Sequence, residues 1–273
     1  MPDMKSISWL RISSSIIAVL LISSAGMADP PTNSLTVASS HPSSKSKTEL
    51  TPRGYLSTYV RVEAGVILFD TGSESPPLLT GLVELGLDQA LIDAVVLSHD
   101  DPEHFHGLSD VLKATAMKPK VFVPPAAAEA LSTQNPGATV VAVAKPTRVL
   151  PDAWLVGPIT VEFEGETSSA QALVLDQPDG LVVIVGCTNP AVASIVEEVK
   201  EVFGHRRINL VAGGIHLRGS KRNAIKEVSL RMQQMGVKRL ALSGCTGEPA
   251  LKIFRQEWGD RVISLDFGNT IGF

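Results

Sequence analysis

Aromatic residues and basic charge are both scarce in this sequence of 273 residues. Phe, Trp and Tyr together make up 5% of the chain, and the formal net charge is -4. Proteins that bind nucleic acid need a surplus of positive charge, and those that bind single strands also stack bases on aromatic rings. We therefore expect no nucleic-acid partner. The hydrophobic content of 44% is that of a globular protein with a substantial core.

Cysteine is also scarce, because the chain has only Cys187 and Cys245. They form no Cys-x-x-Cys motif, so redox chemistry by a thiol pair has little support. In an oxidising compartment they could form a disulfide, and otherwise they could be thiols beside a metal. Their spacing leaves both readings open.

Long apolar runs are absent apart from one near the N-terminus. Lys5 and Arg11 precede the apolar stretch 16–22, and small residues follow as far as Ala28. This pattern predicts a secretory signal peptide at residues 1–28, and hence a periplasmic or secreted protein. An uncleaved anchor is the alternative, but the run is shorter than the roughly 20 residues that a span needs. We expect no stable membrane insertion after cleavage.

The next stretch, residues 29–50, is rich in Pro, Ser, Thr and Lys. This composition predicts a disordered linker, which leaves 51–273 as the folded domain. From Tyr55 on, short apolar runs alternate with amphipathic segments, which predicts an α/β domain with two sheets. Among the expected elements are strands at 55–62, 65–70 and 94–98 and helices at 88–94 and 103–115.

The expected strand 94–98 leads into HDDPEHFH, which holds three of the six histidines of the chain. Asp101-Pro102-Glu103 is a good helix start by itself, with an N-cap, a proline at the first position and an acid in the first turn. Capping does not require His99, His104 and His106 in the same short span. Histidines interleaved with carboxylates favour a metal site, and a helix start can present such ligands.

Further polar residues follow other short apolar strands. Cys187 and Asn189 come after one, His216 after the next, and Cys245 after a third. Ligands in α/β proteins bind at the carboxyl ends of strands, so these side chains could converge on one mouth. Asn189-Pro190 also has a simpler reading as a helix cap.

The motif resembles that of the metallo-β-lactamase superfamily, in which a strand is followed by His-x-His-x-Asp-His and a glycine. His99 and His104 match the first and last histidines of this frame, while Asp101 replaces the second histidine and Glu103 replaces the aspartate. The stretch ILFDTG, residues 67–72, is similar to the strand and turn that precede the motif in the family.

Three later stretches resemble the branch of dihydropterin and ribofuranosylaminobenzene-phosphate synthase-like metallohydrolases. They are GCTNPA at 186–191, GGIHL at 213–217 and SGCTG at 243–247. The chain departs from the branch at Asn189 and Gly244, where histidines are usual. Glu166 falls, in a loose alignment, where relatives place another histidine.

The resemblance implies a four-layer αββα sandwich of two mixed sheets and a metal-dependent hydrolase, and the N-terminal pattern predicts that this hydrolase is exported. Its substrate would be a small ester, lactone, amide or phosphoester. Because carboxylates replace imidazoles, we expect one divalent metal, Zn²⁺ or else Mn²⁺ or Fe²⁺. The expected ligands are drawn from His99, Asp101, Glu103, His104, Cys187 and Asn189.

The same resemblance implies catalytic roles for three side chains. Glu103 would orient a metal-activated water or accept its proton. His216 or His106 would donate to an oxyanion or a leaving group. Arg218, Lys221 and Arg222 could receive an anionic group, although a solvated helix start is the simpler reading. The alternative function is a degenerate member that binds a small ligand without turnover.

Overall fold

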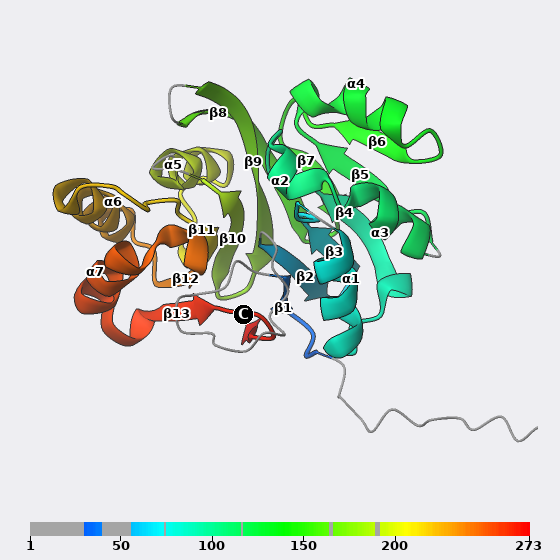
Figure 1. Ribbon diagram of the computed structural model, residues 1–273. Helices are drawn as coiled ribbons and strands as arrows, with labels where there is room; N and C mark the ends of the chain where they lie inside the picture. Colours follow the sequence, from blue (N-terminus) through cyan, green and yellow to red (C-terminus); the bar gives the residue numbers. More distant parts are fainter. Residues whose placement is uncertain (1–29, 40–55, 74, 116, 164–165, 189–191) are drawn as a thin grey trace, which may run out of the picture.

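Two β-sheets pack face to face, and helices cover the outer face of each (Figure 1). This computed structural model describes residues 30–39, 56–73, 75–115, 117–163, 166–188 and 192–273. The four-layer sandwich of two mixed sheets expected from the sequence is confirmed. The predicted signal peptide lies outside the described residues. Within them, no helix combines the length and the apolar character that a membrane crossing requires.

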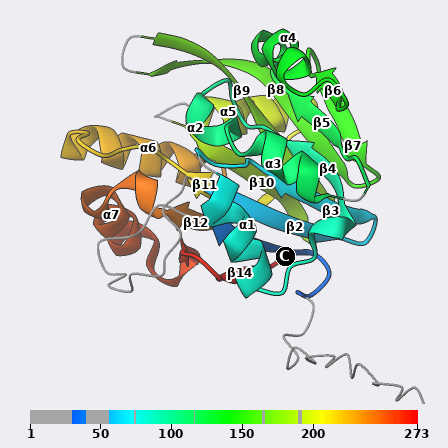
Figure 2. The same ribbon diagram turned by 45° about the vertical axis from the view of Figure 1, so that its right-hand side comes forward.

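The first sheet has seven strands in the order β14-β1-β2-β3-β4-β5-β6. Strands from β14 to β3 pair antiparallel, whereas β3 to β6 pair parallel. Figure 2 shows α1 and α3 in front of this sheet. The elements are β1 Ser34–Ser39, β2 Ser57–Val62, β3 Gly65–Phe69, β4 Ile92–Val96, β5 Lys120–Val123, β6 Thr139–Ala142 and β14 Thr270–Gly272, with α1 Ser75–Glu84, α2 Pro102–Phe105, α3 Leu108–Ala114 and α4 Pro125–Gln134.

The second sheet also has seven strands, in the order β13-β12-β11-β10-β9-β8-β7. Its β10 to β13 are parallel, while β7 to β10 are antiparallel. The elements are β7 Thr147–Leu150, β8 Ala153–Phe163, β9 Glu166–Gln177, β10 Gly180–Cys187, β11 Ile208–Gly214, β12 Arg239–Ser243 and β13 Val262–Leu265, with α5 Val192–Val202, α6 Arg222–Gln234 and α7 Glu248–Trp258.

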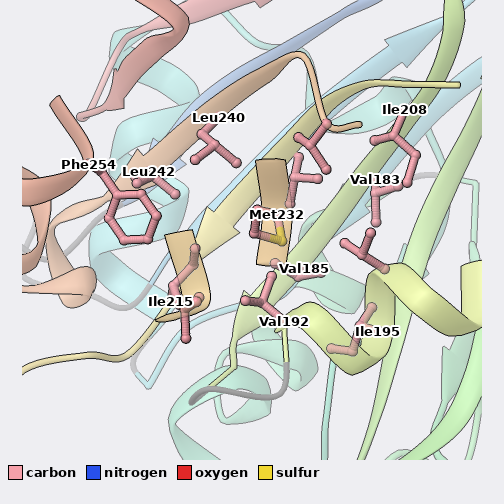
Figure 3. Packing of buried hydrophobic residues seen from close by; sticks show 14 of the residues in the cluster. Val183, Val185, Val192, Ile195, Ile208, Ile215, Met232, Leu240, Leu242 and Phe254 are labelled. Carbon is pink, nitrogen blue, oxygen red and sulfur yellow. The ribbon is translucent and has the colours of Figure 1, made fainter. Parts of the chain in front are cut away.

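The central strands are apolar along their whole length because both of their faces are buried. In β10, Val182 and Ile184 pack between the two sheets, while Val183 and Val185 pack under the helices. Figure 3 shows Val183 and Val185 next to Val192 and Ile195 of α5. Alternating burial of this kind fixes the register, since a slip of one residue would exchange the two faces.

Three sequence predictions about local structure were wrong. Residues 29–50 were expected to be a disordered linker. Within them, Ser34–Ser39 forms strand β1, which pairs with β2 on one side and β14 on the other. The helix expected at 88–94 is a short 3-10 turn, Gln89–Leu91, followed by β4.

The single helix expected from Glu103 to Thr115 is two helices, α2 and α3, which are separated at His106 and Gly107. The Gly107 N–H donates to the carbonyl of Gly72 at 3.2 Å, outside the helix. This tertiary hydrogen bond replaces an intrahelical one and separates the two helices.

Candidate functional site

The candidate site lies where parallel strands of both sheets end. Asp70 follows β3, Ser98 lies two residues beyond β4, and Cys187 is the last residue of β10. The two sheets meet at this edge: the Gln171 N–H of β9 donates to the Ser98 carbonyl at 2.7 Å, and His99 forms an isolated antiparallel bridge with Ala170. The segment after β4 is thereby joined to the middle of β9 in the second sheet.

Two of the predicted ligands, His99 and His104, lie side by side. Their ring centroids are 4.1 Å apart and the rings are tilted by 51°. Both are buried, with exposed fractions of 8% and 1%. His99 enters from the end of β4, whereas His104 enters from α2. Burial of two imidazoles in contact is unusual unless hydrogen bonds or a ligand satisfy their nitrogens.

One buried carboxylate, Asp70, organises this pair. Its Oδ1 accepts from the Ser98 N–H at 2.6 Å, and its Oδ2 accepts from Ser98 Oγ at 2.7 Å. The same Oδ2 lies 2.7 Å from His104 Nδ1. A carboxylate has only acceptor sites, so His104 must carry its proton on Nδ1.

The Ser98 hydroxyl determines which ring nitrogen of His99 carries the hydrogen. Its Oγ lies 2.7 Å from His99 Nδ1, and its single hydrogen is already donated to Asp70. His99 must therefore donate from Nδ1 to Ser98 Oγ. In their neutral forms both imidazoles thus hold a hydrogen on Nδ1 and keep a lone pair on Nε2, which is the form that binds metal ions or accepts a proton.

The two imidazoles differ in their affinity for a proton. Burial, reinforced by the charge of His104, lowers the pKa of His99 to about 4. Burial would also lower the pKa of His104, but the charge and hydrogen bond of Asp70 outweigh it, and the pKa of His104 is raised. His99 is consequently neutral at physiological pH.

Local backbone geometry holds Asp70 and α2 in place. Asp70 has a positive φ of 61°, which directs the chain into a turn. The next N–H, that of Thr71, donates to the His104 carbonyl at 2.9 Å. At the start of α2 the Asp101 carboxylate caps the Glu103 N–H at 2.9 Å, and Pro102 occupies the first turn.

The second sheet supports the other side of the motif. Ser168 Oγ of β9 donates to the Asp100 carboxylate at 2.5 Å. Gln171 Nε2 donates to the carbonyls of Leu97 and Phe122 at 2.6 and 3.3 Å. The segment that carries His99 is therefore fixed by side chains of β9.

The remaining motif residues are placed less favourably. Asp101 is half-buried and its charge contributes to the raised pKa of His104, so it lies near the imidazole pair. Glu103 and His106 are both exposed. His106 packs edge-on against Phe105, with centroids 5.5 Å apart. The structure therefore does not bring Glu103 and His106 into the buried pair.

Only some of the ligands expected from the second sheet lie within the described residues. Asn189 and the side chain of Cys187 lie outside the described residues. His216 is half-buried after β11, and the neighbouring Ile215 N–H donates to Thr246 Oγ1 at 3.2 Å. Cys245 is buried, and its contribution to the raised pKa of His104 places it near that ring.

The donor set fits a divalent metal in part. The two Nε2 lone pairs, backed by Asp70 and Ser98, have the second-shell support typical of histidine ligands. However, no group of three or more His, Cys, Asp or Glu side chains within the described part of the chain is placed to hold a metal. A complete ligand set would need a further donor, and the predicted candidates in the connection after β10 lie outside that part.

Sequence reasoning missed three residues of this site. Asp70 and Ser98 make the hydrogen bonds described above, and Gly186 lies against them. A Cβ at Gly186 would overlap Ser98 Oγ and lie 3.1 Å from Asp70 Oδ2. The stretch ILFDTG contained the signal for Asp70, since a carboxylate directly after an apolar strand needs buried partners.

Comparisons with known proteins agree with this architecture. A family model described as the metallo-beta-lactamase superfamily matches residues 50–228. The 7,8-dihydropterin-6-methyl-4-(beta-D-ribofuranosyl)-aminobenzene-5'-phosphate synthase of Methanocaldococcus jannaschii is 24% identical, and the match covers 76% of this chain and 84% of the relative.

Solved structures show the same fold. Tm1679, described as a metal-dependent hydrolase of the β-lactamase superfamily, superposes with a TM-score of 0.71 at 25% identity, covering 88% of this chain and 98% of the other. YhfI of Bacillus subtilis, a metallo-beta-lactamase fold protein, gives a TM-score of 0.64 at 13% identity, with 87% and 98% covered.

Proposed function

The chain belongs to the metallo-β-lactamase superfamily, and on this basis we propose that it is a metal-dependent hydrolase that acts outside the cytoplasm. The superfamily includes metal-dependent hydrolases such as Tm1679, and the branch inferred from the motifs is confirmed by the relative from Methanocaldococcus jannaschii. That relative is named a synthase, so our choice of an ester, lactone, amide or phosphoester substrate is part of the proposal. Export rests on the pattern of residues 1–28.

The main support for the proposal is the network of hydrogen bonds around Asp70. Asp70 and Ser98 commit the Nδ1 atoms of His104 and His99, so that each ring in its neutral form has its lone pair on Nε2. Burying a carboxylate and two imidazoles costs free energy unless they are paired. A neutral imidazole with its hydrogen on Nδ1 is the form in which histidine ligates a metal through Nε2.

In this proposal His99 and His104 hold the metal, and Asp101, Cys187 or Asn189 complete its coordination. A bound divalent metal would supply Lewis acidity and a water of lowered pKa. Zn²⁺ suits this nitrogen-rich set, and carboxylate participation also admits Mn²⁺ or Fe²⁺. Asp70 prevents rotation of the His104 ring, and Ser98 does the same for His99.

Proton transfer is the task of the half-buried residues. His216 lies two residues beyond β11, and we propose that it donates to the oxyanion or leaving group of a small-molecule substrate. The exposure of Glu103 and His106 makes them weaker candidates for such a task. Asp101, which is half-buried beside the pair, is the better-placed carboxylate to orient a water.

A panel of hydrolysis assays tests the proposal. The full chain is loaded in turn with Zn²⁺, Mn²⁺ and Fe²⁺ and assayed on ester, lactone, amide and phosphodiester substrates. We expect turnover on one class, lost in His99→Ala and retained in His106→Ala, which changes an exposed histidine of the same motif. Absence of turnover with every metal, or equal activity in both variants, would refute the hydrolase.

The alternative, a member that binds a ligand without turnover, is favoured by one observation. The described residues contain no group of three or more side chains placed for a metal, and Gly244 replaces a histidine of the branch. A ligand that binds equally well to His99→Ala and to the original protein, without hydrolysis, would support this alternative.

A further inference from the structure

A hollow of about 320 Å³ lies between α6 and α7. Its floor is apolar, formed by the buried side chains of Ile225 and Ile253. Polar side chains surround the floor: Ser220 and Arg222 from the start of α6, and Lys252 and Gln256 from α7. The volume accommodates a small organic group together with a phosphate or carboxylate.

The charge of this hollow is one-sided. Its lining in the described chain contains two basic side chains, Arg222 and Lys252, and no acidic one. Other cations on these two helices are paired, since Lys226 lies 3.9 Å from Glu257 and Arg255 lies 3.7 Å from Glu248. Within the described residues Arg222 and Lys252 have no such carboxylate.

Arg222 lines the hollow from α6 and Lys252 lines it from α7, so both cations face the same space. An oxyanion in the hollow would accept charge-assisted contacts from both cations. A guanidinium offers paired N–H donors to a phosphate or carboxylate, and an ammonium adds a point charge.

Two loops connect the candidate site with the hollow along the chain. The connection from His216 to Ser220 links the end of β11 to its rim, and the connection after Cys245 leads to Pro249 on the other side. These two loops touch, because a Cβ at Gly247 would lie 3.1 Å from Arg218 Cα. The loops that carry His216 and Cys245 therefore lead directly to residues that line the hollow, Ser220 and Pro249.

We propose that this hollow binds the anionic end of the substrate, a phosphate or carboxylate group, through Arg222 and Lys252. Only the identification of the anion as part of the substrate rests on the proposed hydrolase function. The oxyanion site itself is inferred from the hollow and its charges. It assigns to Arg222 a binding role in place of the solvated helix start that its sequence position first suggested.

The first test measures binding of inorganic phosphate to the full chain by calorimetry at low ionic strength. We expect binding that weakens about tenfold in Arg222→Ala and again in Lys252→Ala. Lys226→Ala is the matched control, because it removes a paired cation from α6 and should leave the affinity unchanged. All three residues are exposed, so the variants should fold. Absence of phosphate binding, or equal weakening in the control, would overturn the site.

The second test asks whether the bound anion belongs to the substrate. The paired substrates are the p-nitrophenyl esters of succinic acid, which keeps one carboxylate, and of valeric acid, which is neutral. In the Arg222→Ala/Lys252→Ala double variant we expect KM to rise about tenfold or more for the succinate ester alone, with kcat unchanged.

The outcomes separate the two proposals. Phosphate binding with equal KM changes for both esters would mean an adventitious ion only and would overturn the substrate subsite. If neither ester nor any other substrate is hydrolysed, the hydrolase function fails, and the phosphate titration alone decides whether the hollow is an oxyanion site.

Discussion

His99 and His104 lie with ring centroids 4.1 Å apart, and each is tied through Nδ1 to the same carboxylate, Asp70. For His104 the link is direct, and for His99 it passes through the Ser98 hydroxyl. One buried aspartate thus sets the tautomers of two residues that come from different elements. This relationship makes the site sensitive to residues that touch no substrate.

In Ser98→Ala we expect His99 to populate both neutral tautomers, while His104 keeps its hydrogen on Nδ1. The variant removes the Ser98 hydroxyl, which bonds to both Asp70 and His99. We expect a loss of about 2 kcal/mol in the free energy of unfolding, as for hydrogen bonds to charged groups. Nitrogen chemical shifts should show His99 protonated at Nδ1 in the original protein and a tautomer mixture in the variant.

The control for this variant is Ser109→Ala, which removes a hydroxyl hydrogen-bonded to Asn135 in another part of the fold. It should leave the His99 shifts unchanged. Identical His99 tautomers in the original protein and in Ser98→Ala would show that the serine does not set them.

Asp70→Asn should destabilise the protein strongly. The carboxylate is fully buried and accepts from the Ser98 N–H, the Ser98 hydroxyl and His104. An amide cannot accept at both ends, so we expect a loss of roughly 3–5 kcal/mol, measured by urea denaturation. The pKa of His104 should fall in the same variant, because the charge that raises it is gone.

Asp110→Asn provides the comparison for Asp70. It removes an exposed carboxylate that pairs with Lys113, and such pairs contribute about 0.5 kcal/mol. A similar loss in the two variants would mean that Asp70 has no special role.

Gly186→Ala should disturb the site through sterics alone. The added methyl group would overlap Ser98 Oγ and approach Asp70, so Ser98 must move. We expect a loss of about 1–3 kcal/mol, as for overpacking in a core. Gly137→Ala, where the methyl group would meet no atom within 4 Å, should change stability by less than about 1 kcal/mol. Equal thermal unfolding of the two variants would argue against the close approach of β10 to Ser98.

Stability of the metal-free protein should decrease as the pH falls from about 6.5 to about 4. The pKa of His99 is lowered from 6.5 to about 4, so within this window the unfolded chain binds a proton at His99 that the folded protein excludes. The window corresponds to roughly 3 kcal/mol. His104 has a raised pKa, so its contribution has the opposite sign and is lost only as the pH rises above 6.5.

Urea denaturation at a series of pH values measures this effect. His99→Gln should flatten the slope between pH 6.5 and 4, while His106→Gln, at an exposed position, should leave it unchanged. An unchanged slope in His99→Gln would mean that the imidazole is solvated in the folded protein.

The sequence predicted most of the fold because its signals are local. Central strands such as β10 are continuous apolar runs, and α5 has a clear helical period, with Val192, Ile195, Val196 and Val199 buried. β1 escaped prediction since one of its two neighbours, β14, lies at the other end of the chain. The composition of the surrounding segment, rich in Ser and Pro, concealed a strand whose stability comes from those partners.

The sequence predicted those site residues that belong to a recognisable motif. It did not predict those whose role depends on tertiary contacts. His99 and His104 were identified from their spacing and lie together. Glu103 and His106 share that motif but are exposed, because α2 is a short helix that buries one side only. Ser98 gave no signal, since its role arises from a hydrogen bond to Asp70, 28 residues earlier in the chain.

The most direct test of the account is the metal content of the full chain, purified without added metal or chelator. Element analysis by mass spectrometry should find about one equivalent of Zn, Mn or Fe in the original protein. It should find almost none in His99→Ala or His104→Ala and a full equivalent in His106→Ala. A folded protein that contains no metal and takes up none on dialysis would contradict the claim that the two buried imidazoles bind an ion.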